Sequence, residues 1–176
     1  VLTQHLAERR TEGVRMNVNF LGEAVLSEAE SERRLQQYLQ GLQWPETEVV
    51  SIKISTLYSQ ISPLAREHTV GVLCDRLERL FRTADRARFT RPDGASVPKF
   101  VYLDMEEYRD KELTAAAFMR TLDRDGLRHV RAGIALQSYI PDSFRTLLQL
   151  QEWARRRVAN GGGRITIRLV KGANME

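Results

Sequence analysis

Four polar side chains stand near the carboxyl ends of four strand-like runs in this sequence: Lys53, Asp104, Gln137 and Arg168. In a parallel sheet these ends meet at one edge, and that edge is where the active sites of α/β proteins are built. An unpaired charge buried there would cost several kcal/mol, on the order of the penalties for buried ions. These groups should therefore pair with one another or with a charged or polar ligand.

A single charged residue on a strand is more often exposed to solvent than catalytic. An ordinary sheet with one wet face would also alternate apolar and polar residues. The recurrence of such a residue on four successive runs, always towards the same end, favours a shared functional site.

Five short apolar or β-branched runs alternate with longer segments of helical periodicity. The expected strands are residues 15–21, 48–55, 99–104, 132–139 and 164–170. The expected helices are residues 27–42, 70–87, 113–122 and 142–158. Ser27 begins a capping-box pattern, residues 91–94 supply a turn, and residues 160–163 form a helix stop signal. The alternation is typical of repeated βα units and a parallel sheet.

Each expected strand has two chemically different faces, because successive side chains point to opposite sides. In the second run Val50, Ile52 and Ile54 share one face, whereas Ser51, Lys53 and Ser55 share the other. The other four runs divide in the same way. With the branched face given first, the two faces are Val18 and Phe20 against Asn17 and Asn19; Val101, Leu103 and Met105 against Phe100, Tyr102 and Asp104; Ile134 and Leu136 against Gly133, Ala135 and Gln137; and Ile165, Ile167 and Leu169 against Arg164, Thr166 and Arg168. We expect the branched faces to contact covering helices and the second faces to line an interior.

Composition and charge exclude several classes of protein. The 176 residues are 42% hydrophobic, which is enough for one sizeable core. The net charge of +4 is spread over predicted helices with acids between many of the bases, so nucleic-acid binding is not expected. No apolar stretch approaches the roughly 18 to 20 residues needed to cross a bilayer, and no secretory leader opens the chain, so we expect a soluble, cytoplasmic protein.

Cysteine, histidine and arginine usage adds no second chemistry. Cys74 lies in an amphipathic run without a partner cysteine, so we expect a buried apolar filler. Residues 155–157 are three consecutive arginines in an expected helix and should form a solvated face. No metal site is expected, because the three histidines have no partner arrangement: His5, His68 and His129.

Five runs, in their order and spacing, resemble the proline dehydrogenase family, which includes the dehydrogenase module of bifunctional proline utilisation proteins. They are Asn19-Phe20-Leu21-Gly22-Glu23-Ala24, Ser51-Ile52-Lys53-Ile54-Ser55, Leu103-Asp104-Met105-Glu106-Glu107-Tyr108, Leu136-Gln137-Ser138-Tyr139 and Arg168-Leu169-Val170-Lys171-Gly172-Ala173. The resemblance implies an α/β fold, a (β/α)8 barrel of about 250 residues. The chain opens with Val1 and ends with Glu176 directly after a strand-like run. We therefore expect residues 1–176 to be one truncated domain with about the first five βα units.

The resemblance also implies an activity. Members of the family hold FAD noncovalently, oxidise L-proline to Δ1-pyrroline-5-carboxylate and pass the electrons to a quinone. This implies peripheral association of the parent protein with the inner membrane face, and a fused pyrroline-5-carboxylate dehydrogenase domain is a further expectation.

Position by position, the resemblance assigns roles to residues of this chain. Lys53 is similar to the lysine that meets the substrate carboxylate. Asp104 and Arg168 resemble the pair with catalytic roles, Arg168 lying near the flavin N5 edge. The residues that resemble flavin contacts are Met105, Gln137, Arg168, Lys171, Gly172 and Ala173, and Glu23 matches a structural glutamate.

The residue types suit this chemistry. A fixed guanidinium favours the negative charge that develops on a reduced flavin. Gln137 can donate and accept at a ring edge of carbonyls and nitrogens. A charge-assisted bond from Lys53 to an amino-acid carboxylate is worth roughly 1.5 to 3 kcal/mol.

The chain departs from the family pattern in two places. Asn174-Met175 stands where many members carry a Tyr-Trp pair. The family's later helix, with a tyrosine and two adjacent arginines that complete the carboxylate clamp, has no counterpart within residues 1–176.

Two alternatives remain at this stage. The chain could be a barrel-derived binding or regulatory module without activity in the truncated form. It could also belong to another barrel enzyme, such as an aldolase that uses Lys53 for a Schiff base, which predicts an adduct on Lys53 that borohydride traps.

Overall fold

The computed structural model describes residues 2–20, 24–105 and 107–171. Its main feature is a sheet of five strands in the order β1-β2-β5-β6-β7, in which every neighbouring pair is parallel. Each expected strand run contains one of them: β1 Asn17–Asn19, β2 Val49–Lys53, β5 Phe100–Asp104, β6 Gly133–Gln137 and β7 Thr166–Val170. The predicted α/β class is confirmed, and the sequential parallel order is that of the first five strands of a βα barrel.

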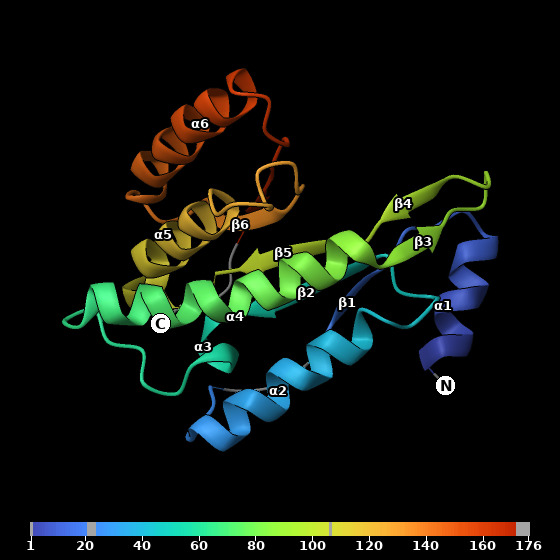
Figure 1. The fold of residues 1–176 in the computed structure, drawn as a ribbon, viewed down its shortest axis with the longest axis horizontal. Helices are drawn as coiled ribbons and strands as arrows, with labels where there is room; N and C mark the ends of the chain where they lie inside the picture. The colour runs from blue at the N-terminus through green and yellow to red at the C-terminus, as the bar shows by residue number, and fades with distance from the viewer. Residues whose placement is uncertain (1, 21–23, 106, 172–176) are drawn as a thin grey trace.

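The helices that connect the strands lie where helical periodicity predicted them. They are α2 Glu28–Gly41, α4 Arg66–Arg86, α5 Lys111–Leu122 and α6 Ser143–Ala159, with a short 3-10 turn, η1 Tyr108–Asp110, before α5. Figure 1 shows α4 and α5 running along the same side of the sheet. The capping prediction for α2 is confirmed, because the Ser27 hydroxyl accepts a hydrogen bond from the Glu30 amide. One expectation is wrong: Ile54 and Ser55 do not extend β2 but begin a short helix, α3 Ile54–Leu57.

The branched faces of β1, β2, β5 and β6 form the core, as the parity of the sequence predicted, whereas on β7 Ile167 is only half-buried and Leu169 is 62% exposed. Ile52, Leu103 and Ile134 are fully buried on the side that the helices cover. Burial of such a side chain contributes roughly 1.5 to 3 kcal/mol. Edge-to-face contacts of Phe118 with Phe81 and with Trp153 join α4, α5 and α6, at ring centroid distances of 6.3 and 5.9 Å. Cys74 is buried in the same core, which confirms the apolar filler, and burial raises the pKa of its thiol.

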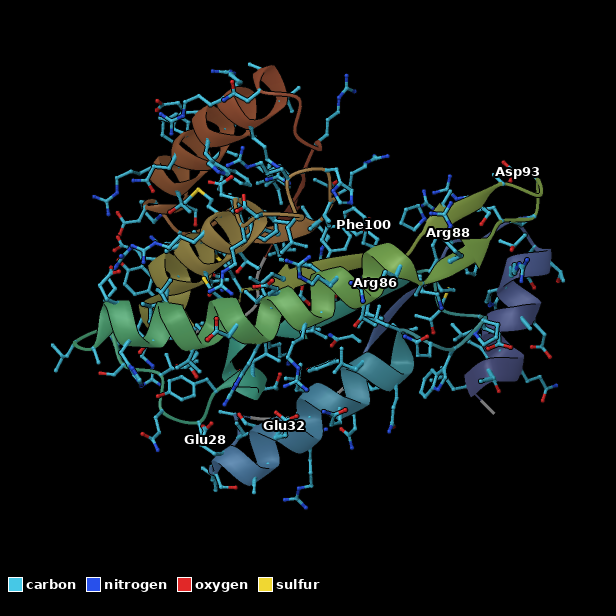
Figure 2. All side chains as sticks on the ribbon, viewed as in Figure 1. Glu28, Glu32, Arg86, Arg88, Asp93 and Phe100 are labelled. Atoms are coloured by element: carbon cyan, nitrogen blue, oxygen red, sulfur yellow. The ribbon has the colours of Figure 1, made fainter. Side chains whose placement is uncertain are left out.

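A helix and a hairpin at one end of the sheet were not anticipated from the sequence. Helix α1 Leu2–Thr11 and the antiparallel hairpin of β3 Arg88–Thr90 and β4 Ser96–Pro98 lie together at the end where the sheet strands begin (Figure 1). The expected turn at residues 91–94 is present at the tip, with Gly94 at φ 83° and Asp93 pointing outward (Figure 2). Strands of three residues outside the main sheet show too little alternation to be recognised.

The prediction that the three arginines at residues 155–157 form a solvated face is partly wrong. Arg157 is buried under the loop that precedes β6, and its guanidinium is surrounded by backbone carbonyls. It donates to the carbonyl oxygens of Leu122, Leu127, Val130 and Gly163. Gly163 is the last residue of the predicted helix stop signal, residues 160–163, in which Gly161 has φ 78°. Arg157 therefore fixes the start of both β6 and β7.

No helix in the described part of the chain is both long enough and apolar enough to span a bilayer.

Substitution of the buried arginine tests this account of the β6 and β7 entrances. Arg157→Leu should lower the free energy of unfolding by about 3 kcal/mol or more, because several buried carbonyls lose their donor at about 1 to 3 kcal/mol each. Arg156→Leu, which removes only an exposed pair with Glu152 one turn away, should cost less than about 0.5 kcal/mol. Denaturant unfolding of both variants measures the difference, and equal losses would contradict the structural role.

Candidate functional site

The candidate site lies on the inner face of the sheet, at the carboxyl ends of its strands. Lys53 of β2 is paired in register with Asp104 of β5, and Ala135 of β6 with Arg168 of β7. Leu103 pairs with Ile134, so the row continues from Asp104 to Ala135. Three of the four sequence-predicted polar residues therefore share one row across the sheet.

An ion pair spans this row. The Arg168 guanidinium donates through Nη2 to Oδ1 of Asp104, and 14% of the Asp104 side chain is exposed. The two residues sit on β7 and β5, which are not neighbours, so the arginine crosses the whole width of β6. This pairing satisfies the requirement that charges on the inner face find partners.

The backbone of Lys53 is held by buried hydrogen bonds. Lys53 is the last residue of β2 and the N-cap of α3. The Thr56 hydroxyl donates to the Lys53 carbonyl at 2.8 Å and lies 2.9 Å from the buried Tyr38 hydroxyl of α2. The strand end that presents Lys53 is therefore anchored to the helix that precedes β2.

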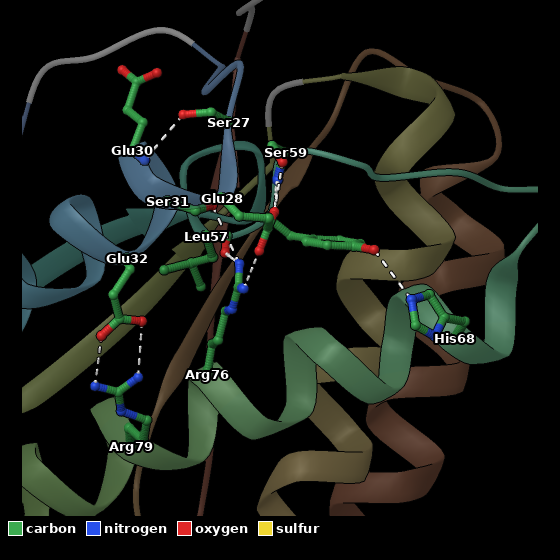
Figure 3. Close-up of polar contacts among 11 residues, drawn as sticks. Ser27, Glu28, Glu30, Ser31, Glu32, Leu57, Ser59, His68, Arg76 and Arg79 are labelled. Atoms are coloured by element: carbon green, nitrogen blue, oxygen red, sulfur yellow. Dashed lines mark hydrogen bonds and ion pairs between the residues drawn. The ribbon is translucent and has the colours of Figure 1, made fainter.

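An arginine of α4 holds the segment that follows Lys53 (Figure 3). Arg76 donates to the Leu57 carbonyl at the end of α3 and to the Glu28 carboxylate of α2, and its guanidinium lies 5.3 Å from the Tyr58 ring centre. Glu28 also accepts two hydrogen bonds from Ser59. Burial alone would raise the pKa of Glu28, but the bonds from Ser59 and Arg76 hold it below its usual value. A single guanidinium thus joins α2, α3 and α4 behind the site.

The remaining predicted contacts have different surroundings. Gln137 ends β6 and is 1% exposed, two residues beyond Ala135 on the same strand face. The Ser138 amide after it donates to the Val170 carbonyl at 2.9 Å, which joins the ends of β6 and β7. Met105 is buried in the hydrophobic core with the outer-face residues. Lys171 is exposed just after β7. Two predicted flavin contacts and the expected structural glutamate lie outside the described residues: Gly172, Ala173 and Glu23.

A second polar cluster occupies the opposite, amino-terminal end of the strands. It borders a cavity of about 590 Å³. Glu48 is buried there, and both Arg15 and Arg91 donate to its carboxylate at 2.7 to 3.1 Å. Burial would raise the pKa of Glu48, but the two arginines lower it below its usual value. The two arginines thus neutralise the carboxylate within the cluster. Because Arg91 belongs to the β3–β4 hairpin, the cluster ties that hairpin to the sheet, and this structural role accounts for its charges.

The residue types of the row at the carboxyl end suit a ligand that carries an anionic group and hydrogen-bonding groups. A lysine and an arginine lie in one row, and an amide side chain stands at the end of the strand between Asp104 and Arg168. Within the described residues no group of three metal-ligating side chains comes together. The arrangement suits binding of a polar or anionic ligand, and stabilisation of its charge, by hydrogen bonds from side chains.

The sequence did not mark the supports of this site. Arg76 looks like any other arginine on an amphipathic helix, and its role depends on contacts 19 and 48 residues away. The only usable signal was Glu28 in the first turn of an expected helix, which is common in helices generally.

Comparison with known proteins identifies relatives of the chain. The sequence model described as proline dehydrogenase matches residues 2–176. Proline utilization A (PutA) from Corynebacterium freiburgense is 41% identical, with a TM-score of 0.89 over 99% of this chain and 17% of that chain. PutA from Bdellovibrio bacteriovorus, solved after inactivation by N-propargylglycine, is 29% identical, with a TM-score of 0.81 over 96% of this chain and 18% of that chain.

A PutA variant from Bradyrhizobium japonicum is 20% identical and has a TM-score of 0.68 over 95% of this chain and 17% of that chain, which shows the fold alone. The chain thus spans less than one fifth of the length of these solved relatives. A comparison with curated proteins found no match.

Two arginines of α4 offer a matched test of the support behind Lys53. Arg76→Met should lower the free energy of unfolding by about 2 to 3 kcal/mol, because it removes charge-assisted bonds to partly buried partners. Arg79→Met, which breaks only the exposed pair with Glu32, should cost less than about 1 kcal/mol. Denaturant unfolding measures both, and losses of equal size would show that Arg76 is an ordinary surface arginine.

Proposed function

The chain belongs to the proline dehydrogenase family, and on that premise we propose that it forms part of a FAD-dependent enzyme that oxidises L-proline to Δ1-pyrroline-5-carboxylate. The observation that carries the proposal is the row of Lys53, Asp104 and Arg168 at the carboxyl ends of the strands. Residues 1–176 would contribute the first five strands of one barrel domain.

The inner-face residues suit an isoalloxazine ring, which when bound would supply the hydride acceptor. Arg168 would stabilise the negative charge that a reduced ring carries. Asp104 would hold the guanidinium in place, because the two side chains are already paired. Gln137 would hydrogen bond to the ring edge, since an amide both donates and accepts. Lys171, Gly172 and Ala173 complete the proposed flavin contacts, together with Met105, which would contribute through its backbone because its side chain packs in the core.

Lys53 would bind the carboxylate of L-proline. Lys53 ends β2 and is in register with Asp104 of the neighbouring strand β5. The bond would be charge-assisted and worth roughly 1.5 to 3 kcal/mol. The support of the Lys53 backbone by Thr56 and Tyr38 would fix the point at which the substrate is held.

The remaining proposals concern the whole protein. We propose a quinone as electron acceptor, peripheral contact of a cytoplasmic parent protein with the membrane, and a fused pyrroline-5-carboxylate dehydrogenase domain. The solved relatives are five to six times longer than this chain, which supports further domains. The alternative is a binding or regulatory module that lacks activity in this short form. No specific observation favours the alternative of an aldolase that uses Lys53 to form a Schiff base.

The visible absorption spectrum of the full-length parent protein tests the function. The purified protein should show a flavin band, and addition of L-proline without an acceptor should bleach it. A flavin band that L-proline leaves unchanged would contradict proline as the substrate. A colourless protein that retains flavin neither as isolated nor after incubation with FAD would favour the binding or regulatory module.

Substitutions of two row residues should separate binding from chemistry. Lys53→Ala should weaken L-proline binding by about 10- to 100-fold, because one charge-assisted bond is lost. Arg168→Met should mainly slow flavin reduction, with a smaller change in the dissociation constant for L-proline. Arg164→Met is the control, because Arg164 is an exposed arginine just before the same strand. Rapid-mixing measurements of flavin bleaching give both constants, and unchanged values in both row variants would refute the site assignment.

A further inference from the structure

The Arg168 guanidinium rests over an aromatic ring of the inner face. Its central carbon lies 5.6 Å from the centre of the Tyr102 ring. Tyr102 belongs to β5, two residues before Asp104, so both side chains point to the same side of the strand. The acceptor of the ion pair and the ring beneath the guanidinium therefore come from one strand.

A glycine on the neighbouring strand makes room for that ring. Gly133 of β6 is in register with Tyr102, and a Cβ built on Gly133 would lie 2.2 Å from a ring carbon of Tyr102. Real Cβ atoms do not approach other carbons so closely, so any larger residue would displace the ring. Gly133 has an ordinary backbone conformation within a strand, where glycine is normally unfavourable, so the ring supplies the reason for it.

The next inner-face residue of β6 is also small. Ala135 is in register with Arg168 and is 2% exposed. The guanidinium must span two strand spacings, about 10 Å between β7 and β5, and a larger side chain at position 135 would stand in its path. The small residues of β6 thus leave room for the Tyr102 ring and for the Arg168 side chain that reaches across β6 to Asp104.

We propose that Tyr102 is a positioning residue whose ring, accommodated by Gly133, holds the Arg168 guanidinium in the orientation that pairs it with Asp104. This inference rests on the proposed function, because Arg168 matters most if it stands beside a flavin. A cation over an aromatic face is attracted by the ring quadrupole, and the hydroxyl contributes little to that attraction. The ring, and not the hydroxyl, is therefore the active element.

Three substitutions in the full-length parent protein test the inference. Tyr102→Leu should slow flavin reduction by L-proline about 3- to 30-fold, the range expected for loss of one cation–π contact. The dissociation constant for L-proline should stay within about twofold of the parent value, because Lys53 is untouched. Tyr102→Phe should restore the parent rate. Phe100→Leu is the control and should leave the rate unchanged. Phe100 packs on the Tyr102 ring at a centroid distance of 5.0 Å, but it lies at the beginning of β5, four residues before Asp104 and away from the ion pair.

Crystal structures of the two Tyr102 variants and of a fourth variant, Gly133→Ala, give a readout that does not depend on activity. Arg168 should remain paired with Asp104 in Tyr102→Phe and turn away in Tyr102→Leu and in Gly133→Ala, where the added methyl group displaces the ring. Gly133→Ala also serves as the second variant should Tyr102→Leu fail to fold.

The outcomes separate this inference from the proposed function. An unchanged Arg168 orientation and flavin reduction rate in Tyr102→Leu or Gly133→Ala would overturn the positioning role. Equal slowing in Tyr102→Phe, or in Phe100→Leu, would overturn it as well. If the parent protein does not bleach with L-proline, the function is wrong, and the Arg168 orientation still decides the role of Tyr102.

Discussion

The ion pair between Arg168 and Asp104 is the interaction on which the architecture of the site depends. It joins strands that are not neighbours, so it requires correct register in the two pairings of β6. A slip of one residue in either pairing would turn one partner towards the helices, where its charge would be buried without a partner. The pair therefore links the geometry of the sheet directly to the chemistry of its carboxyl end.

The two faces of the sheet divide stability from function. The outer face is sealed by branched side chains such as Ile52 and Leu103, which are fully buried beneath the helices. The inner face carries Lys53, Asp104 and Arg168 in one row, and these groups contribute little to the core. Residues on this face can therefore be selected for chemistry, because the other face supplies the hydrophobic burial.

Polar networks outside the site keep its strand ends in place. Arg76 joins α2, α3 and α4 behind Lys53, and Arg157 fixes the loop that leads into β6 and β7. Arg157 donates to four backbone carbonyls, and Arg76 donates to the Leu57 carbonyl and the Glu28 carboxylate, so each satisfies several acceptors with one guanidinium. Glu48 and its two arginines perform the same task at the opposite end of the strands. The rigidity that positions the row thus depends on side chains far from it in the sequence.

The sequence by itself determined the five strands of the main sheet, the four long helices that connect them, and the faces of the strands. The alternation of β-branched and polar residues located all five strands of the sheet, and helical periodicity located α2, α4, α5 and α6, because both signals are local. Parity on each strand also placed Lys53, Asp104 and Arg168 on one face. Parity does not show where a strand ends, and Ile54 begins helix α3 instead of continuing β2.

Only the tertiary structure decided which groups meet. Arg168 and Asp104 are 64 residues apart, and their contact depends on strand register, which no local pattern encodes. The match of Gly133 to the Tyr102 ring depends on the same register. Arg157 turned inward although its neighbours face solvent, because the carbonyls that bind it belong to other segments. Local periodicity shows which way a side chain points, whereas the partner that it finds is set by the packing of distant segments.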